Sequence, residues 1–114
     1  MKKKRKAGGA GARINYEWKA RVIKALAHPS RLIMIDELAK GEKCVCELQR
    51  AVGADITTVS KHLSLMKKAG IVEDRREGVW IYYRLKAPCI LRVLDYLDVA
   101  FQSGGEEEPV MAYR

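Results

Sequence analysis

The spacing of apolar residues predicts two helices at the start of the chain. From near Tyr16, apolar side chains recur at intervals of three and four, the spacing of one helix face: Trp18, Val22, Ala25 and Leu26. His28 interrupts this helix, because the residue before a proline avoids the α region. A second helix is expected to begin at Pro29 or Ser30 and to run through Lys40. Its inward face is predicted to hold Leu32, Ile35, Leu38 and Ala39.

Two more helices are predicted around a glycine-containing turn. The first is short, from about Cys44 to Val52, and Asp55 after the turn is a good N-cap for the next helix. That helix, Ile56 to Ala69, is expected to bury Ile56, Val59, Leu63 and Met66. Its other face carries hydroxyl and cationic side chains and no acid: Thr57, Thr58, Ser60, Lys61, Ser64, Lys67 and Lys68.

After residue 70 the hydrophobic pattern changes to a period of two, which is typical of strands. Residues 71–75 and 79–85 are predicted to form a β-hairpin with a charged turn at residues 76–78. The expected fold is mainly α with this small hairpin as a wing. Its order, four helices, two strands and a last helix, is that of a winged helix-turn-helix.

The last predicted helix has Pro88 in its first turn and a wide apolar face. That face covers roughly half of the circumference and comprises Ile90, Leu91, Val93, Leu94, Leu97, Ala100 and Phe101. So wide a face in a small domain suggests a second surface to bury, most simply the same helix of another subunit. The alternative is that it only closes the core of the monomer. We predict a homodimer with an interface formed by Trp18, Val22, Ile90, Leu94, Leu97 and Phe101.

Composition and charge narrow the class of protein. The chain has 114 residues, enough for one domain, which we place at residues 15–102. Its net charge is +8, and all six charged residues among the first thirteen are basic, so residues 1–14 are predicted to be a flexible basic arm. Such an arm either holds DNA phosphates loosely or serves as a solubilising tail. Residues 103–114 are predicted to form a flexible tail.

No apolar run approaches the roughly 18 residues that span a bilayer, and a glycine-alanine segment follows the basic start where a signal peptide is apolar. We therefore expect a cytoplasmic protein that does not enter a membrane.

The acid-free face of residues 56–69 predicts contact with double-stranded DNA. Short hydroxyl and long cationic side chains suit base edges and phosphates in a major groove. We expect Thr57, Thr58, Ser60 and Lys61 to contact bases or phosphates, and Lys67, Lys68, Arg75 and Arg76 to follow the backbone. The alternative is an ordinary solvated helix beside a surface hairpin.

The three cysteines, Cys44, Cys46 and Cys89, are an odd number without a secretory signal, which argues against a disulfide scaffold. Cys44 and Cys46 are soft donors that favour thiophilic ions. A spacing of two is awkward on a regular helix, but at a helix start the two sulfurs can converge on one ion.

Four segments together resemble the ArsR/SmtB family of bacterial metalloregulatory repressors, over about Tyr16 to Phe101. They are His28-Pro-Ser-Arg-Leu32, Cys44-Val-Cys-Glu-Leu48, Thr58-Val-Ser-Lys-His-Leu63 with Lys68-Ala-Gly-Ile71, and Arg75-Arg-Glu-Gly-Val-Trp-Ile-Tyr-Tyr-Arg-Leu85. The resemblance implies a homodimer joined through its first and last helices, a winged helix that binds operator DNA, and release from the operator when an inducer binds.

The resemblance also implies a soft-metal site at Cys44 and Cys46. Arsenite repressors of the family carry a further cysteine three positions after this pair, where this chain has Gln49. The third ligand is thus left to Cys89, a small thiol or water. Family members that sense cadmium or lead add cysteines from an N-terminal extension, and residues 1–14 have none. Zinc sensors use histidines and carboxylates on the last helix, where this chain has only Asp95 and Asp98.

Three functions remain open. The first is a repressor released by arsenite or antimonite, and the second is a repressor of the same fold whose cysteines sense oxidants or reactive sulfur. A small thiol enzyme or metal-dependent hydrolase fits least well, because the chain lacks a Cys-x-x-Cys motif and a nucleotide-binding glycine motif. His28 and His62, the only histidines, are expected to pack or to form hydrogen bonds rather than to ligate a metal.

Overall fold

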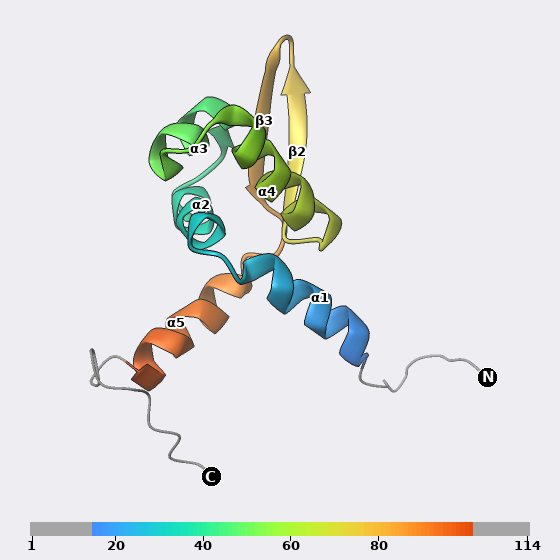
Figure 1. The fold of residues 1–114 in the computed structure, drawn as a ribbon, viewed down its shortest axis with the longest axis vertical. Coiled ribbons are helices and arrows are strands. Elements are labelled where there is room, and N and C mark those ends of the chain that lie inside the picture. The colour runs from blue at the N-terminus through green and yellow to red at the C-terminus, as the bar shows by residue number, and fades with distance from the viewer. Residues whose placement is uncertain (1–14, 102–114) are drawn as a thin grey trace, which may run out of the picture.

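The structure is a computed structural model that describes residues 15–101 (Figure 1). Within this range the chain forms, in order, α1 (Tyr16–Leu26), α2 (Pro29–Ala39), β1 (Lys43–Cys44), α3 (Val45–Val52), α4 (Ile56–Lys68), β2 (Val72–Glu77), β3 (Trp80–Leu85) and α5 (Ile90–Phe101). The five predicted helices and the hairpin are therefore present. The basic arm predicted at residues 1–14 and the tail predicted at residues 103–114 lie outside the described residues.

Side chains cap the starts of three helices. Asn15 Oδ1 accepts a hydrogen bond from the Trp18 amide at 2.8 Å, and His28 Nδ1 accepts one from the Ser30 amide at 3.0 Å. Asp55 Oδ1 accepts one from the Thr58 amide at 3.2 Å, as expected of an N-cap. These caps satisfy amides that have no partner inside their own helix, which sets where each helix begins.

The sheet has three strands in the order β1-β3-β2, one more than the predicted hairpin. In the antiparallel pairing of β1 with β3, Lys43 lies opposite Tyr83 and Cys44 lies opposite Tyr82. The hairpin turn also comes later than predicted, because β2 continues through Glu77. Gly78 then takes a φ of +64°, a conformation that suits glycine in a tight turn.

The core lies among α2, α3, α4 and the base of the sheet. It includes Met34, Ile35, Leu38, Leu48, Val59, Leu63, Met66, Ile71 and Val72. Two residues that were predicted to be buried are not: Ile56 is 47% exposed in the first turn of α4, and Leu32 is 38% exposed on α2. Ala39 is exposed as well, whereas Met34 is buried. Residues 32–35 are all apolar, so the sequence pattern alone does not show which side of α2 faces the core. Packing of α2 against α3 and α4 determines which of these residues are buried.

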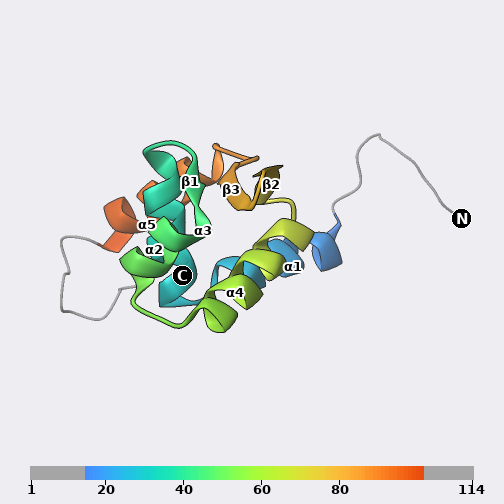
Figure 2. The ribbon, with the colours of Figure 1, turned by 90° about the horizontal axis from the view of Figure 1, so that it is seen from above.

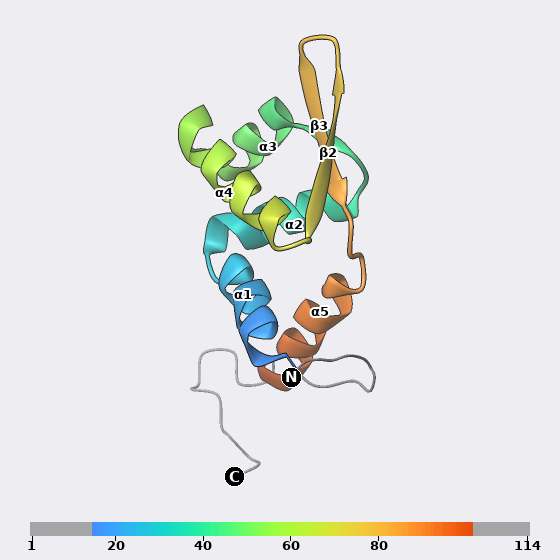
Figure 3. The same ribbon diagram turned by 90° about the vertical axis from the view of Figure 1, so that its right-hand side faces the viewer.

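Helices α1 and α5 extend from the core at the end opposite the hairpin (Figures 1 and 3), and Figure 1 shows them pointing to opposite sides. Seen from above, α1 runs alongside α4 (Figure 2). Only Ala25 and Leu26 of α1 are buried, and no residue of α5 is. Ile90, Leu91 and Leu94 at the start of α5 pack partly against the core. Within residues 15–101, none of the helices has the length and apolar character needed to cross a bilayer.

Candidate DNA interface and thiol site

Helix α4 separates its residues into a buried and an exposed face, as the sequence pattern predicted. Val59, His62, Leu63 and Met66 are buried. All seven residues of the predicted polar face are exposed: Thr57, Thr58, Ser60, Lys61, Ser64, Lys67 and Lys68. The wing, formed by β2 and β3, projects past this helix (Figure 3). The arrangement presents one helix face and one hairpin tip on the same part of the molecule.

The cationic groups on this surface differ in what they already bind. Within residues 15–101, Lys61, Lys68 and Arg76 form no ion pair. Lys67 Nζ lies 3.0 Å from Asp74 Oδ1, and Arg75 is bound by two carboxylates. Lys61, Lys68 and Arg76 can therefore contact phosphates without first breaking an ion pair within the protein.

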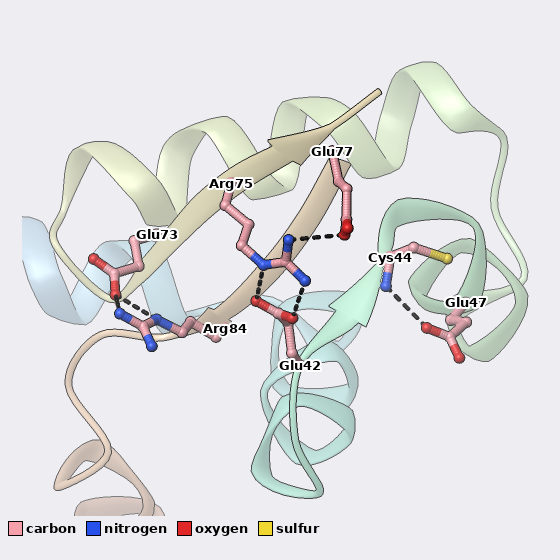
Figure 4. A network of polar contacts seen from close by, with 7 residues as sticks. All are labelled: Glu42, Cys44, Glu47, Glu73, Arg75, Glu77 and Arg84. Carbon is pink, nitrogen blue, oxygen red and sulfur yellow. Dashed lines mark hydrogen bonds and ion pairs between the residues drawn. The ribbon is translucent and has the colours of Figure 1, made fainter. Parts of the chain in front are cut away.

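Arg75 joins the wing to the segment before β1 (Figure 4). Its Nε and Nη2 donate to the two carboxylate oxygens of Glu42 at 2.9 and 2.8 Å, and its Nη1 donates to Glu77 Oε1 at 2.9 Å. The guanidinium carbon also lies 4.7 Å from the centre of the Tyr82 ring, in cation–π range. The hydrogen bonds from Arg75 lower the pKa of the Glu42 carboxyl and raise the pKa of Arg75. Sequence reasoning missed Glu42, because its partner lies 33 residues away.

Cys44 and Cys46, called here the thiol pair, lie together at the start of α3. Cys44 ends β1 and is the N-cap of α3, with extended backbone angles of −81° and 163°, so its side chain does not follow the helical spacing. As a result the two Sγ atoms lie 2.6 Å apart. The carboxylate of Glu47 reaches back to accept a hydrogen bond from the Cys44 amide at 2.9 Å (Figure 4), which holds the turn in place.

The two thiols have different surroundings. Cys44 is buried and Cys46 is half-buried, and both are free. Burial raises the pKa of the Cys44 thiol, and its hydrogen bond with Cys46 raises this pKa further. Cys44 therefore carries its proton at neutral pH, and an ion that binds both sulfurs must displace it.

The structure does not bring a third ligand to the thiol pair. Residues 15–101 contain no group of three or more histidine, cysteine, aspartate or glutamate side chains arranged to hold a metal ion. Cys89, considered as a third ligand, is exposed in the turn before α5 and does not join Cys44 and Cys46. The thiol pair thus fits a thiophilic ion with two sulfurs and leaves further coordination to groups from outside these residues.

Both histidines form hydrogen bonds, as expected. His62 is buried, and its Nδ1 accepts a hydrogen bond from Arg31 Nε at 2.9 Å. His28 caps α2, and the centres of the two imidazole rings lie 4.5 Å apart. Burial lowers the pKa of His62, and the charges of Arg31 and His28 lower it further.

A surface hollow of about 470 Å³ lies beside the thiol pair. It is lined by Cys46, Gln49, Arg50, Gly53 and Ala54. The sequence offered one signal for it, because Cys46, Gln49 and Arg50 are three and four positions apart and so share one side of α3. Neither Arg50 nor the hollow was predicted.

Comparison with known proteins identifies relatives of this chain. Residues 28–74 match the family described as bacterial regulatory protein, arsR family. The chain is 42% identical over 80 residues to the HTH-type transcriptional regulator Rv0324 of Mycobacterium tuberculosis, over 70% of this chain and 35% of that protein. It therefore spans about a third of the length of Rv0324.

Two further proteins match over most of their length. The chain is 34% identical over 94 residues to the arsenical resistance operon repressor of Escherichia coli K12, covering 80% of this chain and 77% of the repressor. The solution structure of the homodimeric winged helix-turn-helix DNA-binding domain Mb0332 of Mycobacterium bovis superposes with a TM-score of 0.68 at 36% identity, covering 82% of this chain and 88% of that domain. The chain belongs to the arsR family of bacterial regulatory proteins, and its described residues fold as a winged helix-turn-helix.

Proposed function

We propose that this protein is a repressor that binds double-stranded operator DNA as a homodimer and is released when arsenite or antimonite binds Cys44 and Cys46. The observation that carries the inducer proposal is the direct contact of the two Sγ atoms at the start of α3. Helix α3 leads through the Gly53 turn directly into α4, so the thiol pair sits at the head of the helix-turn-helix.

The exposed polar face of α4 supports the DNA proposal. Thr57, Thr58, Ser60 and Lys61 lie in its first turns, where side chains of a helix in the major groove reach base edges. Lys67, Arg75 and Arg76 contact phosphates in this proposal, although Lys67 and Arg75 must first loosen their pairs with Asp74, Glu42 and Glu77. Arg76 and Lys61 are therefore expected to contribute most.

The uncovered apolar faces of α1 and α5 support the dimer. Trp18 is 53% exposed and Leu97 is 52% exposed, an unfavourable state for large apolar side chains in water. Val22, Ile90 and Leu94 pack partly against their own core, whereas Trp18, Leu97 and Phe101 project beyond it. We propose that these last three form the centre of the interface, with the first three at its edge. The related M. bovis domain is a homodimer.

The chemistry of the thiol pair supports a thiophilic inducer. Both thiols bind as thiolate ligands, and soft sulfur donors favour arsenite and antimonite over hard cations. The E. coli relative is named for arsenical resistance. Binding at Cys44 pulls the first turn of α3, and Gly53 and Asp55 transmit the displacement to α4.

The contact between the sulfurs of Cys44 and Cys46 also favours a second candidate function. Two free sulfurs side by side without a third ligand can sense an oxidant instead. With hydrogen peroxide, the two thiols lose two protons and two electrons and form one S–S bond, while the peroxide is reduced to two water molecules.

An inducer screen on the reduced protein distinguishes these functions. A duplex that the protein itself selects from random DNA is labelled, and its release is followed by fluorescence anisotropy. Arsenite, antimonite, cadmium, zinc, hydrogen peroxide and a persulfide are each added to the complex. We expect release with arsenite or antimonite. Release only with peroxide or persulfide would establish the second candidate function, and release with none of the six would overturn both.

A further inference from the structure

The thiol pair is one sulfur short of what arsenite takes up. Arsenite carries three oxygen substituents, and each is exchanged for one sulfur when thiols replace them. Cys44 and Cys46 supply two sulfurs, and residues 15–101 bring no third ligand to them. In the complete exchange, three As–O bonds break and three As–S bonds form. The three thiol protons leave with the three oxygens as water, and no oxidant is required.

The hollow beside Cys46 has the features of a binding site for the molecule that carries the third sulfur. Cys46 lines it, and Gln49 and Arg50 line it one helical turn further along α3. Arg50 is exposed and forms no ion pair within residues 15–101. Its guanidinium is a bidentate donor for a carboxylate, and the Gln49 amide can pair with a peptide group.

The hollow is shallow and open to solvent on its outer side. A molecule larger than a bare ion can therefore lie along it while its sulfur reaches Cys46. A thiol peptide with a free carboxylate can place its sulfur beside Cys46 and its carboxylate against Arg50. A small thiol without a carboxylate gains nothing from Arg50.

We propose that the hollow binds a carboxylate-bearing small thiol of the glutathione type, which supplies the third sulfur to an arsenite held by Cys44 and Cys46. This inference rests on the proposed arsenite response and adds the class of the co-ligand and its site. Arg50 and Gln49 orient the thiol, and arsenite together with its thiol binds more tightly than arsenite alone.

The test measures arsenite binding to the DNA-free protein by calorimetry, with either glutathione or cysteamine at equal concentration. Cysteamine has a thiol but no carboxylate. We expect glutathione to give an arsenite affinity higher by about tenfold or more, because hydrogen bonds to charged groups contribute at that level. Native mass spectrometry should show one arsenic and one glutathione on each protomer.

Variants assign the effect to the hollow. Arg50→Gln should abolish the advantage of glutathione over cysteamine, and Arg50→Lys should keep part of it. Arg92→Gln, an exposed arginine on α5, is the matched control and should behave as the wild type. Cys89→Ser should also retain the effect.

The outcomes separate this inference from the proposed function. Equal arsenite affinity with the two thiols, or a glutathione advantage that survives Arg50→Gln, overturns the co-ligand site while the arsenite response stands. Loss of the effect in Cys89→Ser identifies Cys89 as the third ligand and also overturns it. Failure of arsenite to bind with either thiol instead refutes the proposed inducer.

Discussion

Cys44 lies opposite Tyr82 in the antiparallel pairing of β1 with β3, so the start of the thiol site belongs to the same sheet as the wing. The Arg75 guanidinium reinforces this connection, because it binds Glu42, two residues before Cys44, and stacks on the ring of Tyr82. The thiol pair therefore has two physical connections to the DNA-binding surface. One runs through the Gly53 turn to α4, and the other runs through the sheet to the hairpin.

Glu42→Gln tests the connection through the sheet. Removing the carboxylate charge weakens the pair with Arg75, so the wing should respond less to ligand at Cys44. We expect arsenite to bind the free protein as before, while the preference for free over DNA-bound protein, about 5–150-fold in typical allosteric proteins, decreases. Arsenite titrations of the free and DNA-bound protein measure this ratio. Glu73→Gln is the matched control, because it removes a carboxylate that pairs with Arg84 on the same sheet. If Glu42→Gln leaves the preference of arsenite for free over DNA-bound protein unchanged, the thiol pair is coupled to the DNA-binding surface through α4 and not through the sheet.

Cys44→Ser and Cys46→Ser should each keep operator affinity and lose release by arsenite. One thiolate cannot hold the ion against water, so either substitution alone is sufficient. Cys89→Ser should respond nearly as the wild type, because Cys89 does not reach the pair. Anisotropy titrations of the three variants on one operator measure both properties. Release of Cys44→Ser at the wild-type arsenite concentration would falsify the inducer site.

Lys61→Ala and Arg76→Ala should weaken DNA binding and reduce its dependence on salt. Each lost phosphate contact lowers the slope of log affinity against log salt by about 0.9. Thr58→Ala and Ser60→Ala should instead change which operator sequence is preferred. Lys40→Ala, which removes a cation paired with Glu37 on α2, is the control for net charge. If the slopes of Lys61→Ala and Arg76→Ala equal that of the control, neither residue contacts phosphate.

Leu97→Asp should separate the subunits. The substitution places an unpaired carboxylate in the proposed interface, at a cost of about 3–5 kcal/mol. Leu97 is a better choice than Leu94, which also packs against the core of its own subunit, so that a change there also affects folding. Sedimentation velocity at micromolar concentration measures the state of association. Arg92→Asp introduces the same side chain at an exposed polar position of α5 and should remain dimeric. A wild-type protein that sediments as a monomer would remove the interface altogether.

Stability should decrease as the pH falls below the ordinary pKa of histidine, through His62. The pKa of His62 is lowered from its ordinary value of 6.5 when the protein folds. Below pH 6.5 the unfolded chain therefore binds a proton that the folded protein still excludes, and unfolding becomes easier. Protonation also converts Nδ1 from the acceptor of the Arg31 hydrogen bond into a donor. The free energy of unfolding should fall by at most ~1.4 kcal/mol per pH unit from this group. Urea unfolding from about pH 8 to about pH 5 measures it, and His62→Gln should show a flatter profile. Parallel profiles for the two proteins would exclude His62 as the cause.

Much of the fold was predictable because its signals are local. The bounds of α1, the cap at Asp55 and the two faces of α4 depend on residues within one or two helical turns, where periodicity and capping act directly. The predicted exposure of Lys61 and Ser60 followed from the same pattern. The position of Cys44 and Cys46 at a helix start was also predicted from local pattern, whereas the extended backbone of Cys44 follows from the pairing of β1 with β3.

Only the tertiary structure decided the features that join distant segments. Strand β1 is two residues long, too short to show a period, and exists because β3 offers it a partner. The pair of Glu42 with Arg75 and the hollow at Arg50 likewise follow from how α3 and the sheet pack. The exposure of Leu32 has the same origin, because a helix with several adjacent apolar residues turns toward whichever neighbours it meets. Sequence determines which side chains are available within a turn, whereas contacts over some thirty residues form only once the chain has closed its core.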